Sequence, residues 1–532
     1  MSDLQRKVAR VVPFSVFLNA RKNGFLLFMC CLIRIFAAQD VETGVWLKVQ
    51  GTLLIHLTSK TMTRFWKTRL LCSLALLAIS LMLMASSYDL QKPFGFCTRS
   101  SRTDSGAQYA YNITGGGCYE YPVTGVNSNK VITLTSTGND MRTAVTNAIK
   151  NYDVIVFDGS RGDFIISSTI SFSSIKNKTL IGINNARLCT TWFATQEILD
   201  ALNDAGVPHM STSGGGGTLS NGSYVKEEAE YNTRQIIIDM TGDTNEGYRN
   251  SGIFYFKSCQ NLIIRNLAFV GPGSIDVGGS DLLSFYGTKN CWVDHCDFTD
   301  GMDGNFDITQ KSDFNTVSWC TFSYTDRSYM HQNTNLIGSS DSEATSYLNT
   351  TFAFNHWGAN CRARMPMARV GKIHMLNNLF TSAGCGSCIN PRNNSEFLIE
   401  GNYFGEGVMN YYGQSQAVAV TWDSNNYVAE SSDNSIPASI GYAVSVPYLY
   451  IVADCSVVSA EVGAHAGATL FNDANTTKVE SAQNINNSVS QEVFYSLTGQ
   501  QVGRHTHGVV IVNRMFTWCC QRGQRSQGSR RD

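Results

Sequence analysis

One pattern recurs six times through the centre of the chain and constrains its fold more than any other feature. Each copy is a run of alternating polar and apolar residues that closes on an aromatic residue. The copies are "CQNLIIRNLAFVG" (259–271), "TKNCWVDHCDFTD" (288–300), "DFNTVSWCTFSYT" (313–325), "TTFAFNHWGAN" (350–360), "GKIHMLNNLFTSA" (371–383) and "SEFLIEGNYFGEG" (395–407). Their closing aromatics Phe269, Phe298, Phe322, Trp357, Phe380 and Phe404 are 29, 24, 35, 23 and 24 residues apart. Repeats of this length indicate stacked units, none of which can bury its apolar face alone.

The repeats favour an all-β solenoid, specifically a parallel β-helix. Each repeat has room for two or three short strands, and neither a leucine framework nor a 3.6-residue period is present. The excess of glycine (46 residues) over proline (9 residues) also suits short strands joined by tight turns. We therefore expect one large domain with appendages.

Three segments around the repeats carry predictions of their own. "MRTAVTNAI" (141–149) is expected to form a helix that caps the open N-terminal end of the solenoid. Residues 191–230, which include the run "GGGG", are expected to form a long loop. The 35-residue step contains "LIGSSDSEATSYLNT" (336–350), a second loop that leaves the coil. Insertions in a solenoid gather on one face, which is often the binding face.

The two ends of the chain do not share the repeat. Residues 1–61 contain apolar runs such as "FLLFMCCLIRIF" without a sustained period, and we expect them to be a non-native upstream leader. Met62 opens a segment, 62–87, in which basic residues precede an apolar run from Leu70 to Met84 and small residues follow. This order is typical of a signal peptide. The alternative is that the run is a single membrane-anchoring helix.

Charge and cysteine content limit the classes of partner. Basic and acidic residues number 41 and 42, so the net charge of −1 provides no overall field for nucleic acid or an anionic membrane. Any anion must bind locally. Of the 16 cysteines, four in the repeats are expected to be buried, stacked thiols: Cys259, Cys291, Cys296 and Cys320. Cys385 and Cys388 form a C-x-x-C pair, which indicates either a small disulfide loop or half of a metal site.

Three carboxylates on neighbouring coils are candidate metal ligands. Asp281 lies in "GGSDLLSFYG", and Asp303 and Asp307 lie in "DGMDGNFDIT". Adjacent coils of such a fold are about 4.8 Å apart, so carboxylates at matched positions converge, and ligands that are all oxygen favour Ca²⁺. The alternative is that the Asp-Gly pairs only make turns. The strand histidines His295, His356 and His374 are expected to be structural.

The motifs around these residues resemble the pectate lyase family of polysaccharide lyases. The resemblance rests on "WVDH" (292–295), "DGNFD" (303–307), "NLIGSSD" (335–341) and "RMPMARVG" (364–371), in that order, and covers roughly residues 90–470. It implies a right-handed parallel β-helix for the domain, which we place at 88–470.

The resemblance also implies roles for single residues. The family's calcium ligands fall on Asp281, Asp303 and Asp307, its catalytic arginine on Arg364 and its substrate-binding arginine on Arg369. Two positions depart from the family pattern. A further acidic ligand is replaced by Gly279, and a substrate-binding lysine by Asn333. These departures put calcium affinity and the strength of substrate binding in question.

The function expected from the resemblance is a Ca²⁺-dependent pectate lyase that cleaves α-1,4-polygalacturonate by β-elimination. The alternatives are a pectin lyase, which acts on methylated polymer without calcium, and a non-catalytic β-helix that binds acidic polysaccharide. We expect an exported, secreted or cell-surface monomer that binds no nucleic acid and no membrane once mature. Residues 485–516 resemble the C-terminal sorting domains of bacterial type IX secretion, and an irregular basic tail is expected at 517–532.

Overall fold

The computed structural model describes residues 92–101, 108–209, 214–413, 416–430 and 438–472, together with isolated strands within 39–57 and 494–519. Contacts divide the chain into two units, Met1–Lys92 and Pro93–Asp532. In the first unit, β1 (Gln39–Asp40), β2 (Gly44–Val49) and β3 (Leu53–Leu57) form an antiparallel sheet. The predicted signal peptide at 62–87 lies outside the described residues. No helix in the described ranges is long and apolar enough to cross a membrane.

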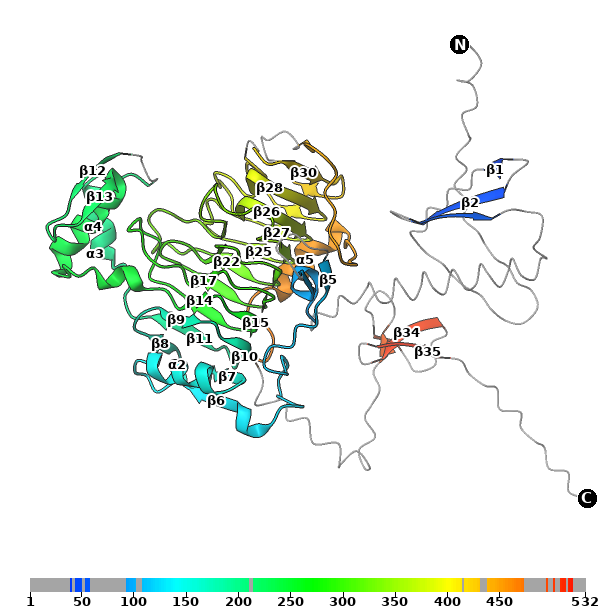
Figure 1. Ribbon diagram of the computed structural model, residues 1–532, viewed down its shortest axis with the longest axis horizontal. Helices are drawn as coiled ribbons and strands as arrows, with labels where there is room; N and C mark the ends of the chain where they lie inside the picture. Colours follow the sequence, from blue (N-terminus) through cyan, green and yellow to red (C-terminus); the bar gives the residue numbers. More distant parts are fainter. Residues whose placement is uncertain are drawn as a thin grey trace, which may run out of the picture. The chain divides into compact units, whose positions relative to one another are not determined.

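The second unit contains a parallel β-helix whose coils each contribute strands to three faces (Figure 1). The first face contains β9 (Ile170–Ser173), β14 (Phe254–Lys257), β17 (Leu283–Tyr286), β20 (Phe306–Thr309), β23 (Leu336–Ile337) and the starts of β26 (Met367–Leu376) and β28 (Asn390–Glu400). The second contains β6 (Val131–Thr135), β7 (Val154–Asp158), β10 (Lys176–Ile183), β15 (Gln260–Arg265), β18 (Trp292–Asp294), β21 (Asn315–Ser318), β24 (Thr350–Ala353), the ends of β26 and β28, and β30 (Ala419–Trp422).

The third face contains β8 (Phe164–Ile166), β11 (Arg187–Thr190), β16 (Ala268–Val270), β19 (Asp297–Thr299), β22 (Thr321–Ser323), β25 (His356–Trp357), β27 (Leu379–Phe380), β29 (Tyr403–Phe404) and β31 (Tyr427–Val428). Neighbouring strands on all three faces pair in parallel, each with the equivalent strand of the next coil. The predicted parallel β-helix is confirmed.

The six closing aromatics of the repeats form one continuous stack inside the solenoid. Their ring centroids are 4.9, 5.2, 5.4, 4.8 and 4.5 Å apart in chain order, with interplanar angles of 17° or less. Stacking at the strand spacing lets each ring cover the next without a void. The uneven sequence steps are therefore absorbed outside these strands, while the register of the third face is constant from β16 to β29.

The corner that precedes this stack is also a ladder. Asn355, Asn378 and Asn402 occupy equivalent places on successive coils, and each side chain accepts a hydrogen bond from the backbone of the coil before it. Cys296 and Cys320 take the same place on the earlier coils, where both thiols are free and buried. Cys259 and Cys291 are also buried free thiols, so the predicted burial of all four is confirmed, whereas equivalent places on successive coils are found for Cys296 and Cys320.

The C-x-x-C pair lies in the turn after the fifth repeat. The Cys385 and Cys388 sulfurs are 3.4 Å apart, both are buried, and both thiols are free. The hydrogen bond from Cys388 lowers the pKa of the Cys385 thiol to about 7. The structure therefore shows a thiol pair at this turn.

The N-terminal end of the solenoid is covered by α2 (Arg142–Asn151), as predicted for 141–149. Its buried residues Val145, Ala148 and Ile149 join the main core. The segment expected to be a loop, 191–230, is instead partly folded, and this prediction is wrong. It contains α3 (Gln196–Asp204), the hairpin of β12 (Gly215–Thr218) and β13 (Tyr224–Glu227), and the start of α4 (Glu228–Thr241).

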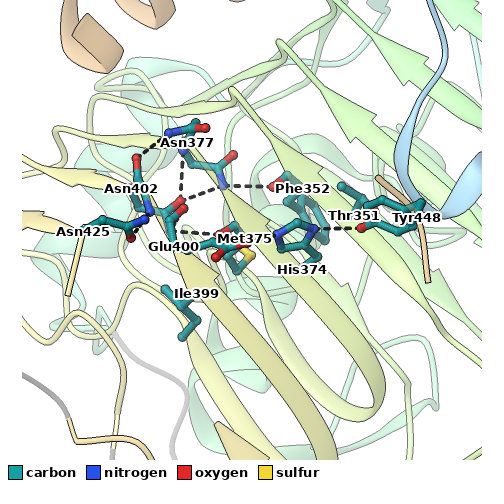
Figure 2. A network of polar contacts seen from close by, with 12 residues as sticks. Thr351, Phe352, His374, Met375, Asn377, Ile399, Glu400, Asn402, Asn425 and Tyr448 are labelled. Atoms are coloured by element: carbon teal, nitrogen blue, oxygen red, sulfur yellow. Dashed lines mark hydrogen bonds and ion pairs between the residues drawn. The ribbon is translucent and has the colours of Figure 1, made fainter. Parts of the chain in front are cut away.

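His295 and His374 are structural, as predicted, and His356 Nε2 lies 2.7 Å from the Thr381 hydroxyl oxygen. Figure 2 shows His374 between the Tyr448 hydroxyl, 2.8 Å from Nδ1, and the Glu400 carboxylate, 3.0 Å from Nε2. Burial lowers the pKa of His374 despite the neighbouring Glu400. His295 is fully buried beside Asp294 and stacks on Trp319. These rings serve packing and internal hydrogen bonding.

Beyond the solenoid, the described strands β32 (Phe494–Tyr495), β33 (Gln501–Val502), β34 (Gly508–Val512) and β35 (Met515–Cys519) pair in antiparallel fashion in the order β33-β32-β34-β35. This pairing differs from the parallel coils. The segment predicted to be a sorting domain is therefore a separate kind of sheet.

Candidate active site

The candidate site lies on the outer surface of the first face. Strand β20 alternates, so that Phe306 and Ile308 point into the core while Asp307 is partly exposed outside. Asp281 precedes β17 on the preceding coil, and Arg364 precedes β26. Parallel stacking brings these positions, which are far apart in sequence, to neighbouring strand ends.

Asp281 and Asp307 converge on the same small space. A Cβ atom built on Gly304 would lie 2.8 Å from Asp281 Oδ1 and 3.3 Å from Asp307 Oδ1. Asp281 Oδ2 accepts a hydrogen bond from the Ser284 hydroxyl at 2.9 Å, whereas Oδ1 is buried without a hydrogen-bond partner. A buried acceptor with no donor costs free energy unless a cation or a proton satisfies it.

The pKa values of Asp281 and Asp307 reflect their burial and, for Asp281, the neighbouring negative charges. Burial, together with the charges of Asp307 and Asp303, raises the pKa of Asp281 well above its ordinary value. Burial likewise raises the pKa of Asp307 to about 7, although Arg364 and the backbone N–H of Leu336 oppose the shift. Both carboxylates therefore favour a proton or a bound cation over the bare anionic state.

Asp303 is near the same pair but has a cationic neighbour of its own. Its Oδ1 lies 3.1 Å from His331 Nε2, and His331 Nδ1 lies 3.9 Å from Asp276. Burial raises the pKa of Asp303, but His331, Arg364 and Arg249 outweigh it and lower the pKa below its ordinary value. Burial lowers the pKa of His331, and the two carboxylates outweigh it and raise that pKa.

Arg364 is an arginine whose charge acts on all three carboxylates of the site. Its positive charge by itself lowers the pKa of each carboxylate. Burial outweighs this contribution at Asp281 and Asp307, whereas the pKa of Asp303 is lowered overall. The residue has φ of +60°, a left-handed conformation that costs a non-glycine residue about 1 kcal/mol or more. Its carbonyl accepts the backbone N–H of Asn335 at 2.8 Å, which holds the segment to the preceding coil.

No residue in the described ranges accepts a hydrogen bond from the Arg364 guanidinium. This side chain is therefore positioned through its backbone and is available to an anionic ligand. Arg362, by contrast, is exposed to solvent.

Arg369 extends the positive side of the site. Its Nη1 donates to the Gly338 carbonyl at 2.8 Å, and its Nε lies 3.3 Å from Asp341 in the loop that leaves the coil. Burial lowers the pKa of Arg369, and the charges of Arg364 and Arg392 add to this effect. Arg392 lies on β28 beside the bulge at Arg369, so three guanidinium groups share this end of the site.

The two departures from the family pattern have different settings. A Cβ on Gly279 would lie 2.5 Å from Met302 Sδ and 3.1 Å from the Arg249 carbonyl, so an acidic residue there has no room without repacking. Asn333 is partly exposed, and its carbonyl faces the Gly304 position at 3.7 Å. Its backbone pairs with Ala363, next to Arg364.

The residues present fit a hard cation only in part. Within the described ranges, no group of three or more His, Cys, Asp or Glu side chains is arranged to hold a metal ion by itself. The unsatisfied Asp281 Oδ1 and the adjacent Asp307 nevertheless supply the oxygen ligands that Ca²⁺ prefers, and such sites are commonly completed by water or substrate oxygens. Asp303 would have to share its carboxylate with His331.

Sequence reasoning missed three residues of this site: His331, Arg249 and Arg392. His331 lies in a loop and Arg249 in the short 3₁₀ helix Gly247–Asn250, where no strand period marks a side chain as outward-facing. Arg249 follows α4 in the chain and donates to the carbonyls of Val277 and Gly278 at 2.7 and 2.9 Å. The signal for Arg392 was its place next to Pro391 at the start of a strand, one coil after Arg369.

Comparisons with known proteins agree on one family. A family model described as pectate lyase matches residues 218–470. Pectate lyase A of Aspergillus niger is 33% identical over 224 residues, which cover 40% of this chain and 64% of the relative. Pectate lyase A of Emericella nidulans is 30% identical over 226 residues, which cover 40% of this chain and 63% of the relative. The chain thus spans somewhat less than two thirds of these relatives.

Similar solved structures carry the same name. Pectate lyase II from Xanthomonas campestris is 20% identical, with a TM-score of 0.45, over 72% of this chain and 99% of that protein. A pectate lyase from Bacillus sp. N165 in complex with trigalacturonate is 18% identical, with a TM-score of 0.43, over 71% of this chain and 98% of that protein.

Proposed function

We propose that the chain is a Ca²⁺-dependent pectate lyase that cleaves α-1,4-linked polygalacturonate by β-elimination and releases 4,5-unsaturated oligogalacturonides. The observation that carries the proposal is the convergence of Asp281 Oδ1 and Asp307 Oδ1 on one space beside Arg364. The matching family model and the relatives of the same name support it.

The substrate's chemistry explains why both charge signs are needed. A galacturonate unit carries a C6 carboxylate next to the C5 proton that must leave. Bound at Asp281 and Asp307, Ca²⁺ would neutralise that carboxylate and so acidify C5–H. Arg369 would hold the same carboxylate through a charge-assisted hydrogen bond, and Asn333 would contact the sugar from the adjacent turn.

Arg364 is the residue proposed to remove the C5 proton. The C5–H electron pair forms the C4–C5 double bond, the C4–O4 bond breaks, and O4 leaves with a proton from solvent. Arginine accepts a proton only when its guanidinium is deprotonated, which is rare below pH ~12. An alkaline medium raises the share of arginine that is neutral.

The two alternative functions differ in what they require of the carboxylates. A pectin lyase needs no calcium, so it has no use for the converging carboxylates Asp281 and Asp307. A non-catalytic polysaccharide-binding β-helix would use the arginines without turnover, and Gly279 and Asn333 favour that alternative.

The proposal also includes the location and assembly of the protein. We propose secretion through the segment at 62–87 and type IX sorting through 485–516. The mature chain is proposed to be a monomer that binds neither membrane nor nucleic acid.

One assay separates the three functions. The full chain is incubated with polygalacturonate or with highly methylated pectin, with calcium or with excess chelator, and the ultraviolet absorbance of the unsaturated product is followed. The proposal predicts product from polygalacturonate with calcium only. Product from methylated pectin in chelator would indicate a pectin lyase, and retention on polygalacturonate without product would indicate a binding protein.

A further inference from the structure

A second row of outward-facing residues runs along the first face from the candidate site toward the N-terminal coils. Lys257 on β14 pairs in register with Tyr286 on β17, and Tyr286 pairs with Thr309 on β20. Ile308 pairs with Ile337, and Ile337 pairs with Ala368. Just past these pairs, a Cβ built on Gly338 would lie 3.6 Å from the Arg369 Cβ, so Gly338 and Arg369 extend the row. Lys257 and the proposed carboxylate-binding Arg369 therefore share one row, four strands apart.

The spacing between successive residues of the row is close to the spacing between successive units of a linear sugar polymer. Strands are about 4.8 Å apart, so Lys257 lies roughly 19 Å along the face from Arg369. One strand spacing is close to the length of one sugar residue. A uronate chain lying across the strands would therefore present its units in step with the coils.

The far end of the row combines an aromatic surface with a cation. Lys257 Nζ lies 5.2 Å from the centroid of the Tyr286 ring, and the Tyr255 ring is 5.9 Å from the same ring at an angle of 44°. Both tyrosines are only partly buried, and Lys257 is exposed. Such rings give a sugar a flat apolar surface with hydroxyl groups at the edge.

The charge of Lys257 is not neutralised by the protein. Lys178 and Lys372 have carboxylate partners at 3.2 and 3.3 Å, whereas none is found for Lys257 in the described ranges. A lysine held over a ring keeps its remaining N–H donors for another acceptor. A carboxylate is the acceptor that gains most from that position.

We infer that Lys257 and Tyr286, with Tyr255 beside them, form a distal subsite that binds one uronate unit of the polymer held at Arg369. This inference rests on the proposed function and adds a binding position to it. The subsite makes the protein prefer long, unesterified chains, because only a chain that crosses the five strands from β14 to β26 contacts Lys257 and Arg369 together.

The test compares KM on trigalacturonate, which is too short to reach Lys257 from Arg369, with KM on octagalacturonate. Lys257→Ala should raise KM on the long substrate about three-fold or more, as expected for an exposed ion pair, and leave KM on the short one unchanged. Tyr286→Ala should act in the same direction, and Tyr286→Phe, which keeps the ring, should have a smaller effect. Lys150→Ala, on the exposed side of α2, removes the same charge elsewhere and serves as the control.

A second readout does not need turnover. Migration through a gel containing polygalacturonate, in chelator, should be retarded less for Lys257→Ala than for the parent chain, and added salt should reduce the difference. Equal KM changes on both substrates, or none on the long one, would overturn the subsite while leaving the lyase intact. If the parent chain neither cleaves nor binds polygalacturonate, the proposed function and the subsite fail together.

Discussion

His331 Nε2 lies 3.1 Å from Asp303 Oδ1, so one of the three carboxylates of the candidate site already faces a cationic partner. This contact lowers the pKa of Asp303 and raises the pKa of His331, so the two side chains form an ion pair when His331 is protonated. This pair competes with any metal for Asp303.

Removing the competitor should strengthen calcium binding. In His331→Gln, Asp303 loses its cation but keeps a neutral neighbour, and the calcium dissociation constant should fall about ten-fold, since hydrogen bonds to charged groups contribute about 1.5–3 kcal/mol. Isothermal titration of the full chain with calcium measures this. A weaker or unchanged affinity would show that Asp303 contributes nothing to the ion's site.

Removing a proposed ligand should do the reverse. Asp307→Asn keeps the shape of the side chain but loses its charge, and the calcium concentration for half-maximal activity should rise by ten-fold or more. Asp204→Asn, at the exposed end of α3, is the matched control and should change nothing. An Asp307→Asn protein with the parent's calcium dependence would take Asp307 out of the site.

The same carboxylate makes a prediction about stability in chelator. The pKa of Asp307 is raised to about 7 in the folded chain, against an ordinary value of 3.8, so the folded state binds more protons between these values. Its contribution to stability is therefore present below about pH 4 and is lost as the pH rises to about 7. Thermal melting in excess chelator should show this fall in the parent and a flatter profile in Asp307→Asn. Equal slopes would contradict the shift.

The two flanking arginines should govern binding more than turnover. Arg369→Lys and Arg392→Lys keep a cation but lose the planar fork, so KM on polygalacturonate should rise several-fold with kcat nearly constant. Arg362→Lys, on the exposed side of the same segment, is the control. A fall in kcat at constant KM would place either arginine in the chemical step instead.

The repeating parts of this fold could be predicted from the sequence, because residues of the same type recur at equivalent places on successive coils. Phe269 and Phe298 mark the same place on two coils, and their rings are indeed stacked. Helix α3 was missed because the glycine run at 214–217 suggested a loop, although Thr195 caps α3 and Leu202 on α3 is buried. His331 was missed because its turn has no period, so only the folded chain brings it to Asp303.

The proposed removal of the C5 proton by Arg364 is tested by kcat on polygalacturonate across pH for the parent and Arg364→Lys. The parent's kcat should climb toward alkaline pH, because a guanidinium accepts a proton only after losing its own. Arg364→Lys should lower kcat on the order of 10² or more with little change in substrate binding, as expected for loss of a positioned base. Near-normal kcat for Arg364→Lys throughout the pH range would contradict the claim and leave this strand a binding surface for acidic polysaccharide.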